Sequence, residues 1–253
     1  MTPGHPPAAE AENEGGRSPY VLLCEHASNV IPLEYTALGL NDADLERHIA
    51  WDIGAAPLAR LLSRRLDAPL FLSGYSRLLI DCNRPAGSST SIPERSEDTV
   101  IPGNAGITME ERARRTAAYF TPLQTMVAAE LDRRTRLAIP TIVLGVHSFT
   151  PVFQGVPRPW DAGLLYAAGA AFARALLDRL AGPGLTLGDN EPYQIDPEHD
   201  FTVPVHGDGR GIPAALLEIR NDHLLTKDGI RQWADRLVPA LQAVVGLAKT
   251  PRP

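Results

Sequence analysis

The sequence has little cysteine and no long apolar run, and these two absences exclude whole classes of protein. Two cysteines among 253 residues cannot supply the disulfide framework of a small secreted domain. No apolar stretch approaches the roughly 18 residues of a membrane-spanning helix, and the N-terminus lacks the basic and apolar segments of a signal peptide. We therefore predict a cytoplasmic protein with no membrane partner, in which Cys24 and Cys82 are buried free thiols at the ends of apolar runs.

Clustered positive charge is absent as well. The formal net charge is -6, and the 24 Lys and Arg residues form no basic block. Because a nucleic-acid-binding protein needs a basic patch to neutralise phosphates, we predict no nucleic-acid partner. The composition, 44% hydrophobic and 21% charged, is ordinary for a soluble globular protein and allows a sizeable core. It leaves the oligomeric state open.

Four common catalytic motifs are missing too. The sequence contains no GxSxG elbow, no GxxxxGKS/T phosphate loop, no HExxH helix and no CxxC pair, which argues against serine-esterase, phosphate-loop, zincin and thioredoxin chemistry. The segment 206–211, HGDGRG, is rich in glycine but does not follow a clear strand and precede a helix. We predict a mobile lid there rather than a phosphate-binding loop.

The patterns that are present indicate one α/β domain. Residues 1–18 have no apolar period and are predicted to be a disordered tail, which leaves residues 19–253 as a single domain. The predicted strands are residues 20–24, 69–72, 78–80, 141–146, 164–166 and 215–219, and the predicted helices are residues 41–66, 108–136, 167–180 and 228–247. Strands that alternate with helices predict a mostly parallel or mixed central sheet with helices on both faces. Two polar segments, 85–107 and 194–211, are candidate lids.

Polar side chains gather where four predicted strands end. In an open parallel sheet, function collects in the crevice beyond the carboxyl ends of the strands. We therefore expect one crevice to receive the side chains of Glu25 and His26, of Asp81, Asn83 and Arg84, of His147 and Ser148, and of Glu218 and Arg220.

A divalent metal explains this composition. Zinc in a hydrolase takes about three protein ligands from His, Asp and Glu and keeps one position open for water. His26 and His147 are the predicted nitrogen ligands, and Asp52 is the predicted third ligand, with His48 on the same helical face as a supporting group or substrate contact. The structural alternatives to metal binding are that His26 and His147 are hydrogen-bonded core histidines, and that His48 and Asp52 form a surface pair on a helix.

Glu218 lies in an apolar strand, where an unpaired carboxylate is costly. The functional interpretation is a general base beside a zinc-activated water. The structural alternative is an ion pair with Arg220 or another arginine.

Arginines are the expected partners of a substrate carboxylate or oxyanion, because the planar guanidinium donates two parallel hydrogen bonds. Arg77 and Arg84 flank the segment LLIDCN and are predicted to be catalytic, and Arg84 and Arg220 are predicted to bind substrate together with His48, Asn83 and Ser148. Arg158 and Arg210 lie in loops rich in glycine and proline and are interpreted as solvated.

Six ordered blocks resemble the N-formylglutamate amidohydrolase family, which splits N-formyl-L-glutamate into formate and glutamate. They are CEHASNVIP at 24–32, HIAWDIGA at 48–55, YSRLLIDCNRP at 75–85, GVHSFTP at 145–151, GDNEPY at 188–193 and LEIRND at 217–222. The resemblance implies a phosphorylase/hydrolase-like or carboxypeptidase-like core, shared with zinc-dependent cell-wall amidases. It also implies Zn²⁺ held by His26, Asp52 and His147, with Glu218 as the catalytic base.

Two segments depart from the family pattern. A turn of the type Pro-His-Ser-Gly is replaced by Glu25-His26-Ala27-Ser28, and a late loop rich in glycine and threonine is replaced by residues 194–206. The expected substrate is therefore a small N-acyl amino acid, with the acyl group and the amino acid left open. An amidase acting on peptide-like or cell-wall fragments and a non-catalytic ligand-binding relative are the remaining alternatives.

Overall fold

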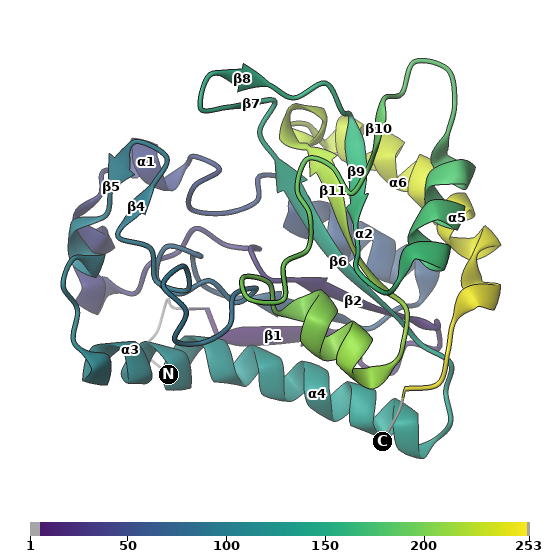
Figure 1. The fold of residues 1–253 in the computed structure, drawn as a ribbon, viewed down its shortest axis with the longest axis horizontal. Coiled ribbons are helices and arrows are strands. Elements are labelled where there is room, and N and C mark those ends of the chain that lie inside the picture. The colour runs from purple at the N-terminus through teal and green to yellow at the C-terminus, as the bar shows by residue number, and fades with distance from the viewer. Residues whose placement is uncertain (1–5, 252–253) are drawn as a thin grey trace.

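A mixed seven-stranded sheet forms the centre of the computed structural model, which describes residues 6–251 (Figure 1). The strand order is β1-β3-β2-β6-β11-β9-β10. The strands are β1 Ala9–Glu12, β2 Tyr20–Cys24, β3 Leu70–Ser73, β6 Ile142–Phe149, β9 Ala162–Leu165, β10 Leu187–Asp189 and β11 Ala214–Arg220. Strands β3, β2, β6 and β11 are parallel, whereas β1 is antiparallel to β3 and β9 is antiparallel to β11. The predicted α/β class is confirmed, with a mixed sheet.

Helices cover both faces of this sheet. They are α1 Asp42–Leu45, α2 Ala55–Leu66, α3 Met109–Arg115, α4 Thr121–Arg136, α5 Ala170–Leu180 and α6 Lys227–Ala243. Helices α2, α5 and α6 pack on one face and α4 packs on the other (Figure 1). Alternate residues of β2 serve the two faces: Tyr20 and Leu22 join the core under α2, and Val21 and Leu23 join the core on the α4 side. This is why the strand is apolar at every position.

Short elements complete the chain. The hairpins are β4 Arg95–Ser96 with β5 Thr99–Val100, and β7 Val152–Phe153 with β8 Val156–Pro157. The short helical segments are Leu33–Gly39, Pro102–Asn104, Thr116–Phe120, Thr202–Gly207, Asp208–Arg210, Asn221–Leu224 and Val245–Leu247. None of the helices within residues 6–251 combines the length and the apolar character that a membrane span needs.

The predicted helix over residues 41–66 is wrong in its middle. Helix α1 stops at Leu45 and α2 starts at Ala55, and the residues between them follow an irregular path. Gly54 allows the turn into α2, because its φ is +79° and a Cβ there would lie 2.3 Å from the Cβ of Leu224. The break places Asp52 in a bend, where its backbone N–H donates to the carbonyl of His26 at 3.0 Å.

The predicted tail, residues 1–18, is wrong where it contains β1, and its first five residues lie outside the described residues. Ala9 and Ala11 pack on the core, and Glu10 and Glu12 pair with Arg60 of α2. The small side chains on one side and the ion pairs on the other stabilise a strand that has no apolar period.

The predicted strand at residues 78–80 is also wrong. Leu78, Leu79 and Ile80 are buried, but they lie in a turn in which the Leu79 N–H donates to Ser76 O at 3.0 Å and Leu78 O accepts from Asn104. Burial without a neighbouring strand therefore explains this apolar run.

The remaining predicted elements are confirmed, with shifted ends. Strands β6 and β11 both continue past their predicted ends. His147 therefore lies within a strand rather than after it, and Glu218 lies within its strand, as predicted. Cys24 and Cys82 are buried free thiols, as predicted.

Candidate metal centre and active site

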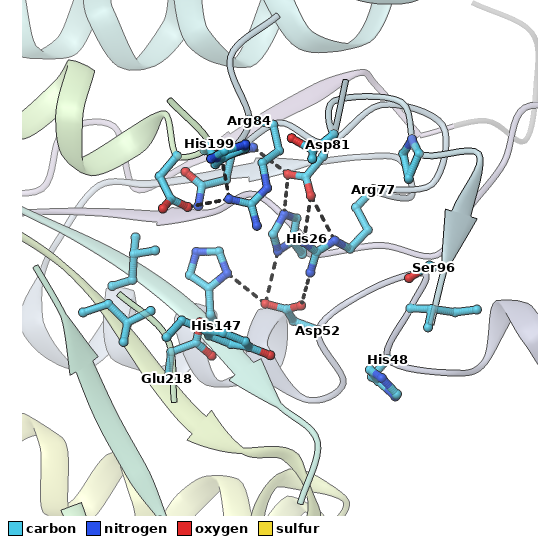
Figure 2. Close-up of a pocket in the computed structure, with 18 of the residues that line it drawn as sticks. His26, His48, Asp52, Arg77, Asp81, Arg84, Ser96, His147, His199 and Glu218 are labelled. Carbon is cyan, nitrogen blue, oxygen red and sulfur yellow. Dashed lines mark hydrogen bonds and ion pairs between the residues drawn. The ribbon is translucent and has the colours of Figure 1, made fainter. Parts of the chain in front are cut away.

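A pocket of about 470 Å³ opens beyond the carboxyl ends of the parallel strands (Figure 2). It brings together segments that are far apart in the sequence. Of the predicted site residues, those that line it are His26, His48, Asp52, Arg77, Asn83, Arg84, His147, Ser148 and Glu218. Arg220 is the predicted site residue that the pocket does not include.

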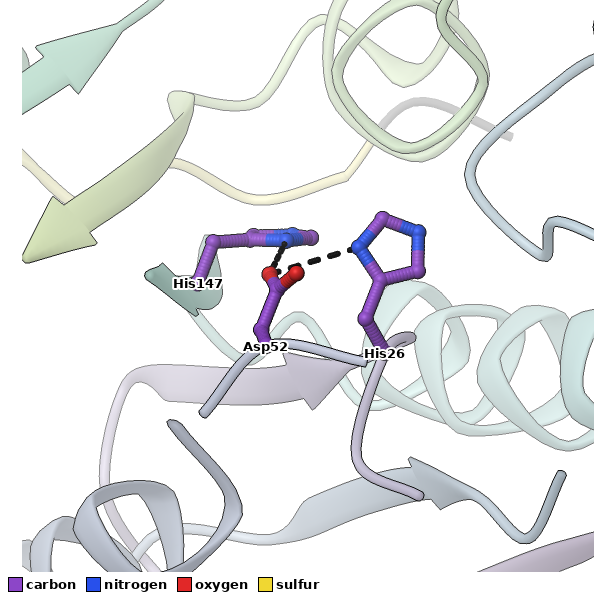
Figure 3. A group of neighbouring side chains, drawn as sticks. All are labelled: His26, Asp52 and His147. Carbon is purple, nitrogen blue, oxygen red and sulfur yellow. Dashed lines mark hydrogen bonds and ion pairs between the residues drawn. The ribbon is translucent and has the colours of Figure 1, made fainter. Parts of the chain in front are cut away.

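His26, Asp52 and His147 form the centre of this pocket (Figure 3). All three are buried, and one potential ligand atom from each lies within 4.8 Å of the others. Asp52 Oδ2 lies 2.8 Å from His147 Nδ1 and 3.3 Å from His26 Nδ1. Both rings converge on one carboxylate, and both are buried and hydrogen-bonded, so metal binding and the alternative of hydrogen-bonded core histidines stay predictions.

Backbone connections fix these three residues. His26 follows the end of β2, and His147 lies in β6, which pairs in parallel with β2 through Leu23 and Gly145. The bend before α2 carries Asp52 to the same place, where its carboxylate also accepts from the Ser148 N–H at 3.3 Å.

A further carboxylate lies behind each histidine. Asp81 Oδ1 lies 2.8 Å from His26 Nε2, and Glu25 Oε2 lies 3.1 Å from His147 Nε2. Asp81 is itself bound by Arg77, and Glu25 accepts from the Thr202 hydroxyl. Carboxylates in this position select the tautomer of a metal-binding histidine, so the arrangement turns the Nδ1 atoms toward Asp52.

These contacts govern the charge of the centre. Burial alone raises the pKa of Asp52, but His26 and His147 lower it well below its usual range. Burial and the charge of Arg77 lower the pKa of His26. Asp81 and Asp52 raise this pKa by more, so the net shift is upward. The pKa of His147 is raised well above its usual value because Glu25 and Asp52 outweigh burial. Each histidine and the carboxylates around it therefore stabilise one another's charged forms.

Glu218 lies beside His147 on the neighbouring strand, in direct register. Its carboxyl group is buried, and Oε2 has no hydrogen-bond partner among the described residues. Burial raises its pKa to about 7. The predicted alternative, an ion pair with Arg220, is wrong, because the guanidinium of Arg220 pairs with Asp161 and Asp222.

Gly163 lies opposite Glu218 on the antiparallel strand β9. It leaves room for residues 189–193, which lead to the pocket residue Tyr193. A Cβ at Gly163 would lie 1.9 Å from Glu191 O. The missing side chain therefore lets residues 189–193 lie against β9 and places Tyr193 at the pocket.

The predicted arginines differ in their charge partners. Arg77 donates to Asp81 Oδ2 from Nε at 3.0 Å and from Nη2 at 2.7 Å, and its Nη1 lies 3.5 Å from Asp52. Arg84 donates to Asp200 Oδ1 at 2.6 Å and to His199 O. Both line the pocket with their charge already compensated.

His48, Asn83 and Ser148 also line the pocket. His48 Nε2 lies 3.4 Å from Glu97, not against Asp52, so the predicted helical pairing of these two residues is wrong. The Asn83 side chain accepts from Thr202 N at 2.9 Å, and the Ser148 hydroxyl donates to Ile53 O at 2.8 Å. Substrate contacts by these three residues stay predictions.

The two candidate lids both contribute pocket residues. Segment 85–107 contributes Thr90, Pro93, Ser96 and Glu97, and segment 194–211 contributes Gln194, Asp196, His199 and Asp200. The glycine-rich residues 206–211 do not line the pocket. Lid motion stays a prediction.

The sequence placed Glu25 and Asp81 in the crevice but gave them no role there, and Arg158 was interpreted as solvated. Asp81 ends an apolar run, so the desolvation reasoning used for Glu218 would have singled it out. Arg158 is only 8% exposed and packs among aromatic rings. No local pattern in the sequence indicates that packing.

The donor set fits a divalent cation. Two imidazoles and one carboxylate, with a neighbouring pocket, match a catalytic zinc site with an open position. The buried, unpartnered Oε2 of Glu218 supports this, since an ion-activated water beside His147 would satisfy it.

Comparisons with known proteins agree with the fold and the motifs. The sequence model described as N-formylglutamate amidohydrolase matches residues 18–225. The chain is similar to the crystal structure of gene product Atu2144 from Agrobacterium tumefaciens, with 34% identity, a TM-score of 0.90, and coverage of 97% of this chain and 98% of that chain. It shares its fold with N-formylglutamate amidohydrolase from Ralstonia eutropha, with 16% identity, a TM-score of 0.66, and coverage of 94% and 97%. No curated protein matches its sequence. The chain belongs to the N-formylglutamate amidohydrolase family.

Proposed function

We propose that this protein hydrolyses the N-formyl or other small N-acyl amide of an amino acid, with one Zn²⁺ held by His26, Asp52 and His147. The observation that carries the proposal is the convergence of these three side chains in one pocket with Glu218, whose Oε2 has no hydrogen-bond partner within residues 6–251. Family membership supplies the class of bond, a linear amide.

The residues of the chain have distinct roles in this reaction. The bound ion supplies Lewis acidity, which polarises the acyl carbonyl and lowers the pKa of water. Glu218 takes the proton from the attacking water and later gives it to the leaving amine. Its buried position in β11, with a raised pKa, suits a group that must carry a proton between two atoms.

Asp81 and Glu25 hold the two imidazoles in position from behind. Because each occupies the Nε2 side of its histidine, the Nδ1 atoms remain available to the ion. Arg77 and Arg84 stay predictions as oxyanion-stabilising groups, and Arg84, His48, Asn83 and Ser148 stay predictions as substrate contacts.

The pocket favours a small substrate over a cell-wall fragment. Its volume of about 470 Å³ lies in the range of small-molecule sites. Arg77 and Arg84 lie in its lining, where they pair with Asp81 and Asp200.

The experiment combines metal analysis with a substrate panel. Purified protein is assayed for zinc content and for release of formate, acetate and amine from N-formyl and N-acetyl amino acids, before and after chelation. We expect one zinc per chain and chelator-sensitive hydrolysis of an N-acyl amino acid with an acidic side chain. Hydrolysis that persists after complete metal removal contradicts the metal mechanism, and no hydrolysis of any panel member by zinc-loaded protein contradicts the substrate class.

A further inference from the structure

Thr202 lies behind the proposed metal centre and does not line the pocket. It is buried at the start of the short helical segment Thr202–Gly207, and its hydroxyl donates to Glu25 Oε1. The other oxygen of this carboxylate, Oε2, lies 3.1 Å from His147 Nε2. Thr202 is therefore connected to a proposed zinc ligand through one carboxylate.

The Thr202 hydroxyl sets the orientation of the Glu25 carboxylate. Within residues 6–251, Glu25 Oε2 has no hydrogen-bond partner, although it is close enough to His147 Nε2 for an ion pair. The hydrogen bond to the Glu25 side chain in this part of the chain comes from Thr202. Because Glu25 is buried, bulk water cannot replace the lost donor if the hydroxyl is removed.

The backbone around Thr202 is held independently of its hydroxyl. The Thr202 N–H donates to Asn83 Oδ1 at 2.9 Å, and the Phe201 N–H donates to Asn83 O at 3.1 Å. The next residue, Val203, is buried in the core on the α4 side. A substitution that removes the hydroxyl alone therefore leaves the position of the backbone unchanged.

Asn83 extends these contacts to the second proposed histidine ligand. Its N–H donates to Asp81 Oδ1 at 2.9 Å, and the same oxygen lies 2.8 Å from His26 Nε2 (Figure 2). The supports behind the two imidazoles thus form one connected series. The series runs through His26, Asp81, Asn83, Thr202, Glu25 and His147.

We propose that Thr202 is a positioning residue, which orients Glu25 and thereby holds the His147 ring with Nδ1 toward the metal. A carboxylate on the Nε2 side of a metal-binding histidine fixes its tautomer and ring orientation. Without the hydroxyl, Glu25 can rotate away and the ring loses this support. The residues 201–203 thereby have a fixed place in the centre, although they belong to the segment 194–211 that the sequence predicted to be a lid.

This inference rests on the proposed function, because it takes His26, Asp52 and His147 to hold Zn²⁺. It does not depend on which N-acyl amino acid is the substrate. Zinc binding can therefore test it without any measurement of turnover.

The test removes the hydroxyl and measures zinc affinity by competition with a chromophoric chelator. Thr202→Val keeps the branched shape and the backbone hydrogen bonds but cannot donate to Glu25. Loss of an outer support of a metal-binding histidine costs about 10- to 100-fold in affinity, so we expect at least about 10-fold weaker Zn²⁺ binding. Thr202→Ser restores the hydroxyl and should restore most of the affinity. Thr141→Val is the matched control and should bind Zn²⁺ like wild type, because Thr141 is equally buried but donates to Ile139 O.

A double-mutant cycle tests whether Thr202 acts through Glu25. Once Glu25→Gln has removed the anionic support, there is no carboxylate left for Thr202 to orient. The double variant should therefore bind Zn²⁺ as weakly as Glu25→Gln alone, and multiplied losses would overturn the proposed route. The visible absorption of Co²⁺ bound in place of Zn²⁺ reports ligand geometry, so it should change in Thr202→Val and stay constant in Thr141→Val.

Hydrogen exchange of the wild-type protein tests the inference if Thr202→Val does not fold. Because binding at linked sites is reciprocal, Zn²⁺ should protect the Thr202 N–H from local opening. The Tyr166 N–H is the control, since it also donates to an asparagine side chain, Asn190 Oδ1 at 2.8 Å, but lies outside the pocket lining and the series of contacts. Exchange should slow more at Thr202 than at Tyr166, and equal slowing would overturn the inference.

The outcomes separate this inference from the proposed function. Zinc affinity that is unchanged by His147→Ala contradicts the metal centre and with it the proposed function. Affinity that falls in His147→Ala but stays at the wild-type value in Thr202→Val overturns the role of Thr202 alone. Thr202→Ser binding Zn²⁺ as weakly as Thr202→Val also overturns it, because the hydroxyl is then not the cause.

Discussion

Replacing Glu218 by glutamine should remove turnover and stabilise the metal-free protein at the same time. Glutamine keeps the shape of the side chain but cannot take a proton from water. General-base catalysis typically contributes about 100- to 10,000-fold, so we expect kcat to fall about 1,000-fold, which corresponds to about 4 kcal/mol of activation free energy. The substitution touches none of the three proposed ligands, so the zinc content should stay at one per chain.

The gain in stability follows from the burial of the carboxyl group. Its pKa rises from 4.5 to about 7 in the folded protein. A carboxyl group with a raised pKa makes the protein less stable as pH rises from 4.5 to 7, because the unfolded chain loses the proton first. Above pH 7 the ionised group therefore costs the metal-free fold on the order of 3 kcal/mol, at about 1.4 kcal/mol per pKa unit. At pH 8, Glu218→Gln should raise the Tm by roughly 6–12 °C.

The assay is thermal unfolding of the chelated protein at pH 5 and pH 8, together with steady-state kinetics of the zinc-loaded protein. Glu110→Gln, an exposed glutamate on α3, is the control and should change neither quantity. A Glu218→Gln protein that keeps its turnover would refute the assignment of the base. A variant that loses its zinc would instead make Glu218 a ligand.

Three other perturbations have expected results. Asp81→Asn should weaken zinc binding about 10- to 100-fold, measured by competition with a chromophoric chelator, because it loosens the support of His26; unchanged affinity would contradict that role. Zinc at 100 times its Kd should stabilise the fold by about 2.7 kcal/mol, and Asp52→Ala should abolish the resulting Tm shift. Burial lowers the pKa of His206 from 6.5 to about 4. On acidification the unfolded chain therefore takes up a proton first, and the free energy of unfolding falls by about 3 kcal/mol between these pH values. His206→Gln should flatten this pH dependence in denaturant titrations carried out at several pH values, and an unchanged pH dependence would contradict the role of His206.

The ends of the central strands were predictable from the sequence. Because most of the site residues lie at these ends, their position in one pocket was predictable too. Apolar runs at residues 20–24, 141–146 and 215–219 indicate strands covered on both faces, and the carboxyl ends of parallel strands meet at one edge. That reasoning placed His26, His147 and Glu218 together. The family resemblance pointed to the same residues.

Features that depend on contacts between distant segments were not predictable in the same way. The helical period continues through Asp52, but Gly54 has a positive φ and lies too close to Leu224 for a Cβ, and α2 begins only after it. The strand at residues 9–12 exists because β3 offers it an edge, not because its own sequence favours a strand. The aromatic neighbours of Arg158 come from a hairpin and from a loop after β10, and its local sequence indicates neither.

Anomalous diffraction from zinc-loaded crystals tests the central claim most directly. Data collected on both sides of the zinc absorption edge should show one strong peak per chain, about 2.0–2.2 Å from His26 Nδ1, His147 Nδ1 and a carboxylate oxygen of Asp52, with Glu218 facing its open side. A peak bound by other residues, or protein that contains zinc but shows no peak among these three side chains, would contradict the proposed metal centre.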